Sequence, residues 1–147
     1  MTSDRPKPDL ESSIWIARPP EDIWNYVVDV SNDTQWRKDV TDAQWDSSPP
    51  HGVGSTGLHV VEGVGDWPWK VTDWEEPRIM SWDVTGGRFE GGHAGYRLAP
   101  EGDGSRMTLH ISVKRSALMR ILMLIMKRRF RRDLAADLEK LKVIMES

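Results

Sequence analysis

The chain has 147 residues, a length typical of one domain with a single hydrophobic core. Its net charge of −3 gives no overall positive field for nucleic acid, and the absence of cysteine excludes disulfides, thiolate metal ligands and a thiol nucleophile. The N-terminus lacks an apolar signal segment, and the longest apolar run, residues 117–126, is too short to span a bilayer. We therefore expect a cytoplasmic protein with one domain over 10–147, preceded by a disordered tail over 1–9.

The first third of the chain predicts a strand followed by two short helices. Residues 10–17 are typical of a strand, and Pro20, Glu21 and Asp22 are typical of the first turn of a helix, where proline is tolerated and acids are stabilised by the helix dipole. Asn32 is expected to cap a second short helix over 33–38.

Glycine, proline and serine at 47–57 indicate a turn. Gly52, Gly54 and Gly57 have the spacing G-x-G-x-x-G, which in dinucleotide-binding proteins lies between a strand and a helix. Here a strand is expected to follow, so we interpret these glycines as part of a hairpin turn.

The region from 55 to 114 predicts an antiparallel meander. It contains five strand-like segments with turn residues between them, namely 58–64, 67–74, 78–86, 89–99 and 106–114. In the last segment Met107, Leu109, Ile111 and Val113 alternate with polar residues, which indicates a sheet with one apolar face.

Residues 116–147 contain no glycine or proline and predict one long helix. Its apolar stripe, which should lie against the sheet, comprises Met119, Met123, Met126, Phe130, Leu134, Leu141 and Ile144. The elements together predict an α+β fold in which a curved antiparallel sheet wraps around a long C-terminal helix, with two short helices between the first two strands.

Three segments resemble the START-like superfamily, also called SRPBCC or helix-grip, and within it the polyketide cyclase/dehydrase group of bacterial proteins. They are RPPEDIWNYVVDVSNDTQW at 18–36, YRLAPEGDGSRMTLHISV at 96–113 and RRFRRDLAADLEKLK at 128–142. The likeness runs from about Leu10 to Glu146 and rests mostly on structural residues. It implies the helix-grip fold, and the superfamily includes polyketide cyclases, lipid-transfer proteins and hormone receptors.

Such a fold implies a cavity, because a straight helix does not fill a strongly curved sheet. Ligand pockets of this kind are lined mainly by apolar and aromatic side chains. Strand alternation and the helix stripe predict a ligand-binding set of Trp36, Trp69, Val71, Met80, Trp82, Tyr96, Leu98, Leu109, Ile111, Met123, Met126 and Phe130. The alternative for each of them is simple core packing.

The polar candidates for this cavity are few. Glu62 has the same strand parity as Leu58 and Val60, so an undistorted strand would place its carboxylate on the apolar face, where burial raises a carboxyl pKa. A bulge or strand end that brings Glu62 to water is the favoured alternative. Tyr96 would carry a hydroxyl into the cavity, and a glycine bulge could turn His93 inward.

The four histidines show no metal-ligand spacing, and no Ser-His-Asp arrangement can be read from the sequence. We expect no metal and no cofactor. Any catalytic residue would come from Glu62, His93 or Tyr96.

The outer side of the long helix also carries apolar residues. Leu118, Ile121, Leu122 and Ile125 lie there, followed by Arg128, Arg129 and Arg132. Loops of the same domain, a second subunit in a homodimer, or peripheral contact with an anionic membrane could cover this side.

These observations favour a protein that binds a small hydrophobic molecule, such as a lipid or a polyketide-like aromatic. The main alternative is a cyclase or dehydratase on the same scaffold, in which one acid or base assists the positioning of a reactive chain. A third interpretation is a regulatory protein that docks on a membrane or a partner. No contact with nucleic acid is expected.

Overall fold

The computed structural model describes residues 7–147, so most of the tail predicted over 1–9 lies outside the described residues. Seven strands form one antiparallel sheet in the order β1-β7-β6-β5-β4-β3-β2. The strands are β1 (Leu10–Ile16), β2 (Val40–Trp45), β3 (Thr56–Val61), β4 (Gly65–Glu75), β5 (Ile79–Val84), β6 (His93–Glu101) and β7 (Gly104–Ser112).

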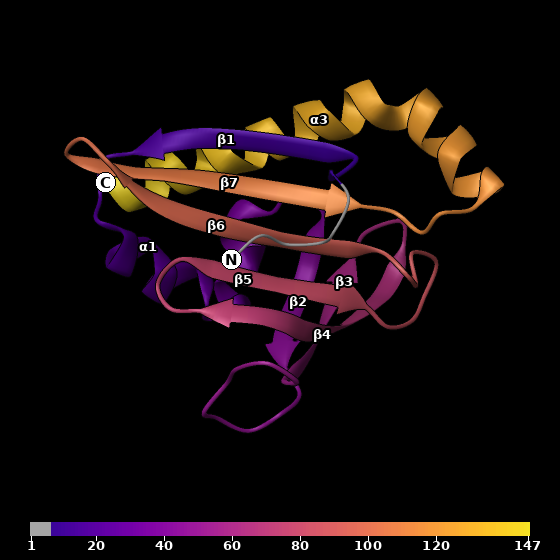
Figure 1. Cartoon of the computed structure of the whole chain (residues 1–147), viewed down its shortest axis with the longest axis horizontal. Coiled ribbons are helices and arrows are strands. Elements are labelled where there is room, and N and C mark those ends of the chain that lie inside the picture. The colour runs from indigo at the N-terminus through magenta and orange to yellow at the C-terminus, as the bar shows by residue number, and fades with distance from the viewer. Residues whose placement is uncertain (1–6) are drawn as a thin grey trace.

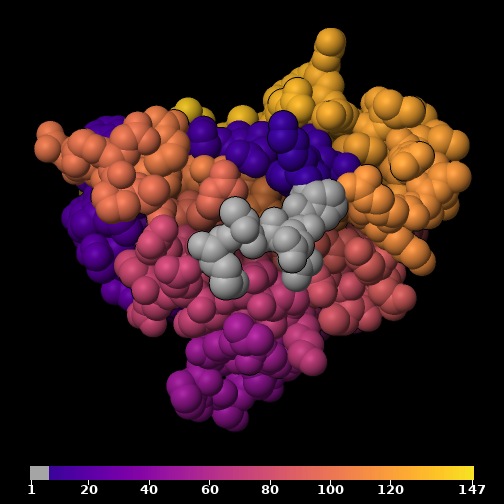
Figure 2. All heavy atoms as spheres, viewed as in Figure 1, coloured from indigo at the N-terminus to yellow at the C-terminus, as the bar shows by residue number. Residues whose placement is uncertain are grey.

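Helices cover one face of this sheet. They are α1 (Pro20–Val27), the 3-10 helix η1 (Val30–Asn32), α2 (Asp33–Trp36) and the long α3 (Ala117–Glu146). Figure 1 shows α3 running along β1, with its first half extending past the end of β7. In the space-filling view of Figure 2, this half lies at the right-hand end of the sheet. The helix-grip fold predicted from the sequence is therefore confirmed.

Local chemistry explains the ends of the helices. Pro20 begins α1, and Glu21 and Asp22 lie in its first turn, as predicted. The side chain of Ser116 caps α3 by accepting a hydrogen bond from the backbone N–H of Met119 over 3.2 Å.

Three local details differ from the expectation. Strand β2 was not anticipated, because its sequence VTDAQW has little apolar alternation. Helix α2 ends at Trp36 and not at Lys38. The predicted turn is the loop of the β2–β3 hairpin and contains Gly52 and Gly54, but Gly57 lies inside β3.

Strand register defines the face of the sheet that α3 covers. Val71 pairs with Trp82, Met80 with Tyr96, and Tyr96 with Leu109, and all except Trp82 are at most 4% exposed. Aromatic rings extend this core toward α1, since Trp24 packs edge-to-face against both Trp74 and Tyr96.

Among residues 7–147, no helix has a stretch long and apolar enough to cross a membrane.

Candidate functional site

A cavity of about 240 Å³ lies between the inner face of the sheet and α3. Five aromatic residues line it, namely Trp67, Trp69, Trp82, Phe89 and Phe130. Aliphatic side chains make up much of the remaining wall, including Leu10, Val40, Val61, Val64, Val84, Leu109, Ile111, Val113, Met123 and Leu134. The cavity is thus mainly apolar and suited to enclose an apolar molecule.

Small residues in β6 and just before it explain why this part of the sheet leaves space. Ala94 pairs with Trp82 on one side and with Ile111 on the other, so it lies on the inner face between two large side chains. Ala94 and the buried Gly92 both line the cavity. Because neither side chain extends far from the backbone, the space in front of them remains empty.

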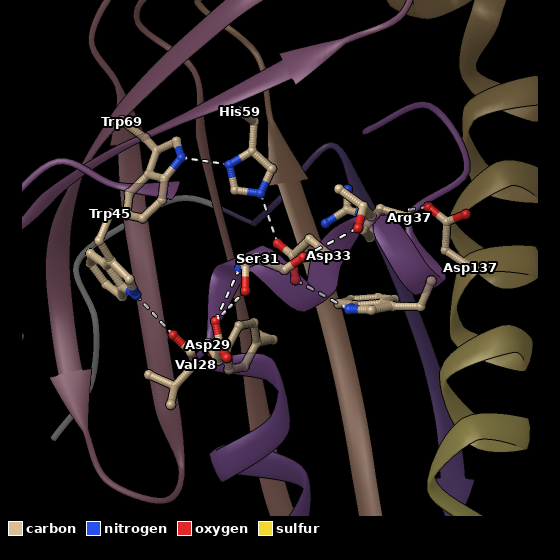
Figure 3. Close-up of polar contacts among 12 residues, drawn as sticks. Val28, Asp29, Ser31, Asp33, Arg37, Trp45, His59, Trp69 and Asp137 are labelled. Carbon is tan, nitrogen blue, oxygen red and sulfur yellow. Dashed lines mark hydrogen bonds and ion pairs between the residues drawn. The ribbon is translucent and has the colours of Figure 1, made fainter. Parts of the chain in front are cut away.

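One wall contains a buried polar network that connects β3, β4 and α2 (Figure 3). The ring of His59 lies 2.7 Å from Asp33 through Nε2, and the indole N–H of Trp69 donates to Nδ1 of His59 over 2.6 Å. The other carboxylate oxygen of Asp33 accepts a hydrogen bond from the indole N–H of Trp36 over 3.2 Å. Only 12% of the His59 side chain and 10% of the Asp33 side chain are exposed.

The network determines the protonation pattern of His59. Nδ1 accepts a hydrogen bond and so carries no proton, which means that the proton of a neutral ring lies on Nε2 and is donated to Asp33. Both ring nitrogens are therefore engaged. In this arrangement His59 orients Trp69 in the cavity wall and has no lone pair available for a substrate.

A second polar pair joins α2 to α3 at the cavity. Nε of Arg37 lies 3.2 Å from a carboxylate oxygen of Asp137, whose other oxygen accepts the backbone N–H of Lys38 over 3.1 Å. Burial raises the pKa of Asp137, although Arg37 and the Lys38 N–H act in the opposite direction. The pair attaches the C-terminal half of α3 to the segment that follows α2.

The twelve residues predicted to bind ligand divide between the cavity and the core. Trp69, Trp82, Leu109, Ile111, Met123 and Phe130 line the cavity. Val71, Met80, Tyr96 and Leu98 are buried in the core, Trp36 is buried beside Asp33, and Met126 is half-buried on α3, all outside the cavity lining.

The three polar candidates do not present a free acid or base to the cavity. Glu62 follows the end of β3 and lies exposed at the rim, so its carboxylate reaches water, as the favoured alternative had it. The hydroxyl of Tyr96 donates to Sδ of Met80 over 3.2 Å in the core, and burial raises the pKa of Tyr96 well above its usual value.

His93 is among the residues that line the cavity. It has the opposite strand parity from Ala94, and Nδ1 of its ring lies 2.8 Å from the Asp83 carboxylate, so the ring is engaged there. Within the described residues, no group of three or more His, Asp or Glu side chains is placed to hold a metal ion.

His59 was not recognised from the sequence as a cavity residue. Leu58 and Val60 were expected on the inner face, but His59 pairs with Trp67 and Gly57 pairs with Trp69, so the inner set is Gly57, His59 and Val61. Both faces of β3 carry apolar residues, so alternation alone assigned Leu58 and Val60 to the wrong face. The pairing of β3 with the tryptophans of β4 is what identifies His59 as an inner-face residue.

Solved structures with the same fold are numerous but distant in sequence. Protein TTHA0849 from Thermus thermophilus has a TM-score of 0.71 at 17% identity, with 90% of this chain and 93% of that chain covered. The Aha1 protein from Colwellia psychrerythraea, solved as a dimer, has a TM-score of 0.67 at 20% identity, with 93% and 95% covered. The di-domain ARO/CYC protein StfQ of the steffimycin biosynthetic pathway has a TM-score of 0.72 at 11% identity, and the likeness covers 92% of this chain but 49% of StfQ.

No curated protein sequence matches the chain. The sequence model of one protein family, described as "Polyketide cyclase / dehydrase and lipid transport", matches residues 7–146. This match covers nearly the whole chain and agrees with the helix-grip architecture. The protein therefore belongs to the polyketide cyclase/dehydrase and lipid transport family of the START-like superfamily.

Proposed function

We propose that the protein binds a small, flat apolar molecule in the cavity between the sheet and α3, and that it acts as a carrier or sensor of that molecule. The observation that carries this proposal is the aromatic lining, in which Trp69 and Trp82 lie 5.9 Å apart and Trp67 stacks on Phe89 at 4.7 Å. Aromatic walls favour flat ligands, because rings gain from stacked and edge-to-face contacts beyond their buried area.

The cavity volume limits the size of the ligand. An apolar cavity of about 150 Å³ is known to hold benzene, so about 240 Å³ suits a molecule of roughly two fused rings or a short acyl segment. The cavity is also open at its rim, where Glu62 and Val64 lie, so a longer ligand would extend outward there.

The Asp33–His59 pair is the observation that favours the second candidate, a cyclase-type enzyme. A carboxylate beside an imidazole is a common general base, and family members with this fold include cyclases. The indole N–H of Trp69 occupies the nitrogen that such a base would use. We therefore place binding ahead of catalysis.

The test is native mass spectrometry of gently purified protein, followed by extraction and identification of any bound compound. Titration with an environment-sensitive apolar dye measures the cavity independently. A co-purified flat apolar compound that displaces the dye would support the proposal. A protein that carries no such compound and does not take up the dye would overturn it.

A further inference from the structure

The first half of α3 exposes an apolar patch that no loop of the described chain covers. The patch consists of Leu118, Ile121, Leu124 and Ile125, which are 72%, 56%, 83% and 74% exposed. Leu122, which was predicted to lie on the same side, is half-buried. Soluble proteins rarely expose several large apolar side chains side by side unless the patch has a binding role.

The charge around this patch is strongly one-sided. Residues 114–132 contain eight lysines and arginines and no acidic residue. The rest of the chain has 12 basic residues against 23 acidic ones. Positive charge is therefore concentrated in residues 114–132, and the remainder of the chain is net negative. Arg128, Arg129 and Arg132 continue the exposed side of the helix directly after the patch.

This charge argues against a second copy of the chain as the partner. A symmetric dimer through the patch would bring two acid-free basic segments against each other, and like charges across an interface oppose association. An amphipathic helix with exposed leucine and isoleucine and flanking arginines matches the chemistry of an anionic membrane surface.

The cavity lies on the other side of the same helix. Met123 and Phe130 line the cavity, whereas Ile121 and Ile125 project away from it into solvent. The same segment of α3 therefore lines the cavity with one side and exposes the apolar patch on the other. From these observations we infer that the first half of α3 docks on an anionic lipid bilayer, with its apolar patch in the interface and its arginines on the headgroups. This inference does not depend on the identity of the ligand or on the proposed binding function.

The test is co-sedimentation of the full chain with vesicles of phosphatidylcholine alone and of phosphatidylcholine with 30% phosphatidylglycerol. We expect binding to the anionic vesicles only, and weaker binding as salt rises. The double variant Arg128→Gln/Arg132→Gln should bind about fivefold more weakly for each arginine removed.

The matched control for the patch is on the same helix. Ile125→Glu should abolish vesicle binding, whereas Val143→Glu, at a residue that is 66% exposed but outside the basic segment, should leave it unchanged. Circular dichroism checks that both variants fold. Failure of the wild-type chain to bind anionic vesicles at low salt, or equal binding by the two Glu variants, would overturn the inference. A mass that doubles with concentration and falls in Ile125→Glu, without vesicle binding, would assign the patch to a second copy instead.

Discussion

Gly57 lies directly beneath the indole of Trp69, so close that a Cβ atom at this glycine would come within 2.2 Å of the ring. The absence of a side chain at Gly57 is what allows Trp69 to lie across β3 and reach His59. This single contact therefore determines the position of one wall of the cavity.

The variant Gly57→Ala should displace Trp69 and lower the free energy of unfolding by about 1–3 kcal/mol. Chemical denaturation measures the loss, and dye titration should show weaker binding. The matched control is Gly52→Ala, where a Cβ would meet no atom within 4 Å, so the change should stay within about 0.5 kcal/mol. Equal effects of the two variants would contradict the proposed role of Gly57.

The regular strands and the long helix could be predicted because the residue pattern within each element is enough to identify it. Met107 and Leu109 alternate with polar residues along β7, and the long helix lacks glycine and proline. The cavity is different, because Tyr96 and Trp82 lie on the same face, yet Tyr96 packs in the core and Trp82 lines the cavity. Their difference depends on neighbours from other strands, which a single sequence does not display.

The variant Ala94→Leu should fill the cavity and weaken dye binding by about tenfold or more. Stability should stay unchanged or rise by about 1 kcal/mol, since filling an empty apolar space commonly stabilises a protein. The control is Ala99→Leu, at an exposed position of the same strand, which should alter neither quantity. A destabilised Ala94→Leu protein with normal dye binding would mean that Ala94 is tightly packed.

The variant Trp69→Phe removes the N–H that Nδ1 of His59 accepts. It should cost about 1–3 kcal/mol of stability, because a buried acceptor loses its partner. In nitrogen NMR, the His59 ring should keep its Nε2–H form, because Asp33 still accepts that proton, while the Nδ1 resonance should move toward that of an imidazole nitrogen without a hydrogen bond.

The comparison variant is Trp15→Phe, whose N–H donates to the exposed Glu101 carbonyl over 2.8 Å, so water can replace it at little cost. If Trp69→Phe leaves the Nδ1 resonance of His59 unchanged, Nδ1 does not accept a hydrogen bond from Trp69 in solution.

His110, on the face of the sheet opposite α3, should make stability depend on pH. Burial, with smaller contributions from His93 and Arg97, lowers the pKa of His110 from 6.5 to about 4, while Glu11 and Asp73 act in the opposite direction. Between these pH values the unfolded chain binds a proton that the folded chain does not, so stability falls as pH decreases from 6.5 to 4.

The variant His110→Gln should lack this component. Relative to its own stability at pH 7, it should lose about 1–3 kcal/mol less than the wild-type chain on reaching pH 4. Urea unfolding at pH 7, 5.5 and 4 measures the difference. Parallel pH profiles for the two proteins would show that His110 titrates normally.

The attachment of α3 is uneven along its length. Within the described residues 7–147, α3 makes polar contacts with β1, with the segment after β1 and with the segment after α2. These contacts involve Asp137, Lys142, Met145 and Glu146, which all lie in its second half. The first half instead contributes Met123 and Phe130 to the cavity wall. Backbone amides over 117–130 should therefore exchange with deuterium faster than those over 134–146, within one continuous helix. Under the proposed binding function, a ligand would enter and leave by local opening of this half, while the seven-stranded sheet stays folded.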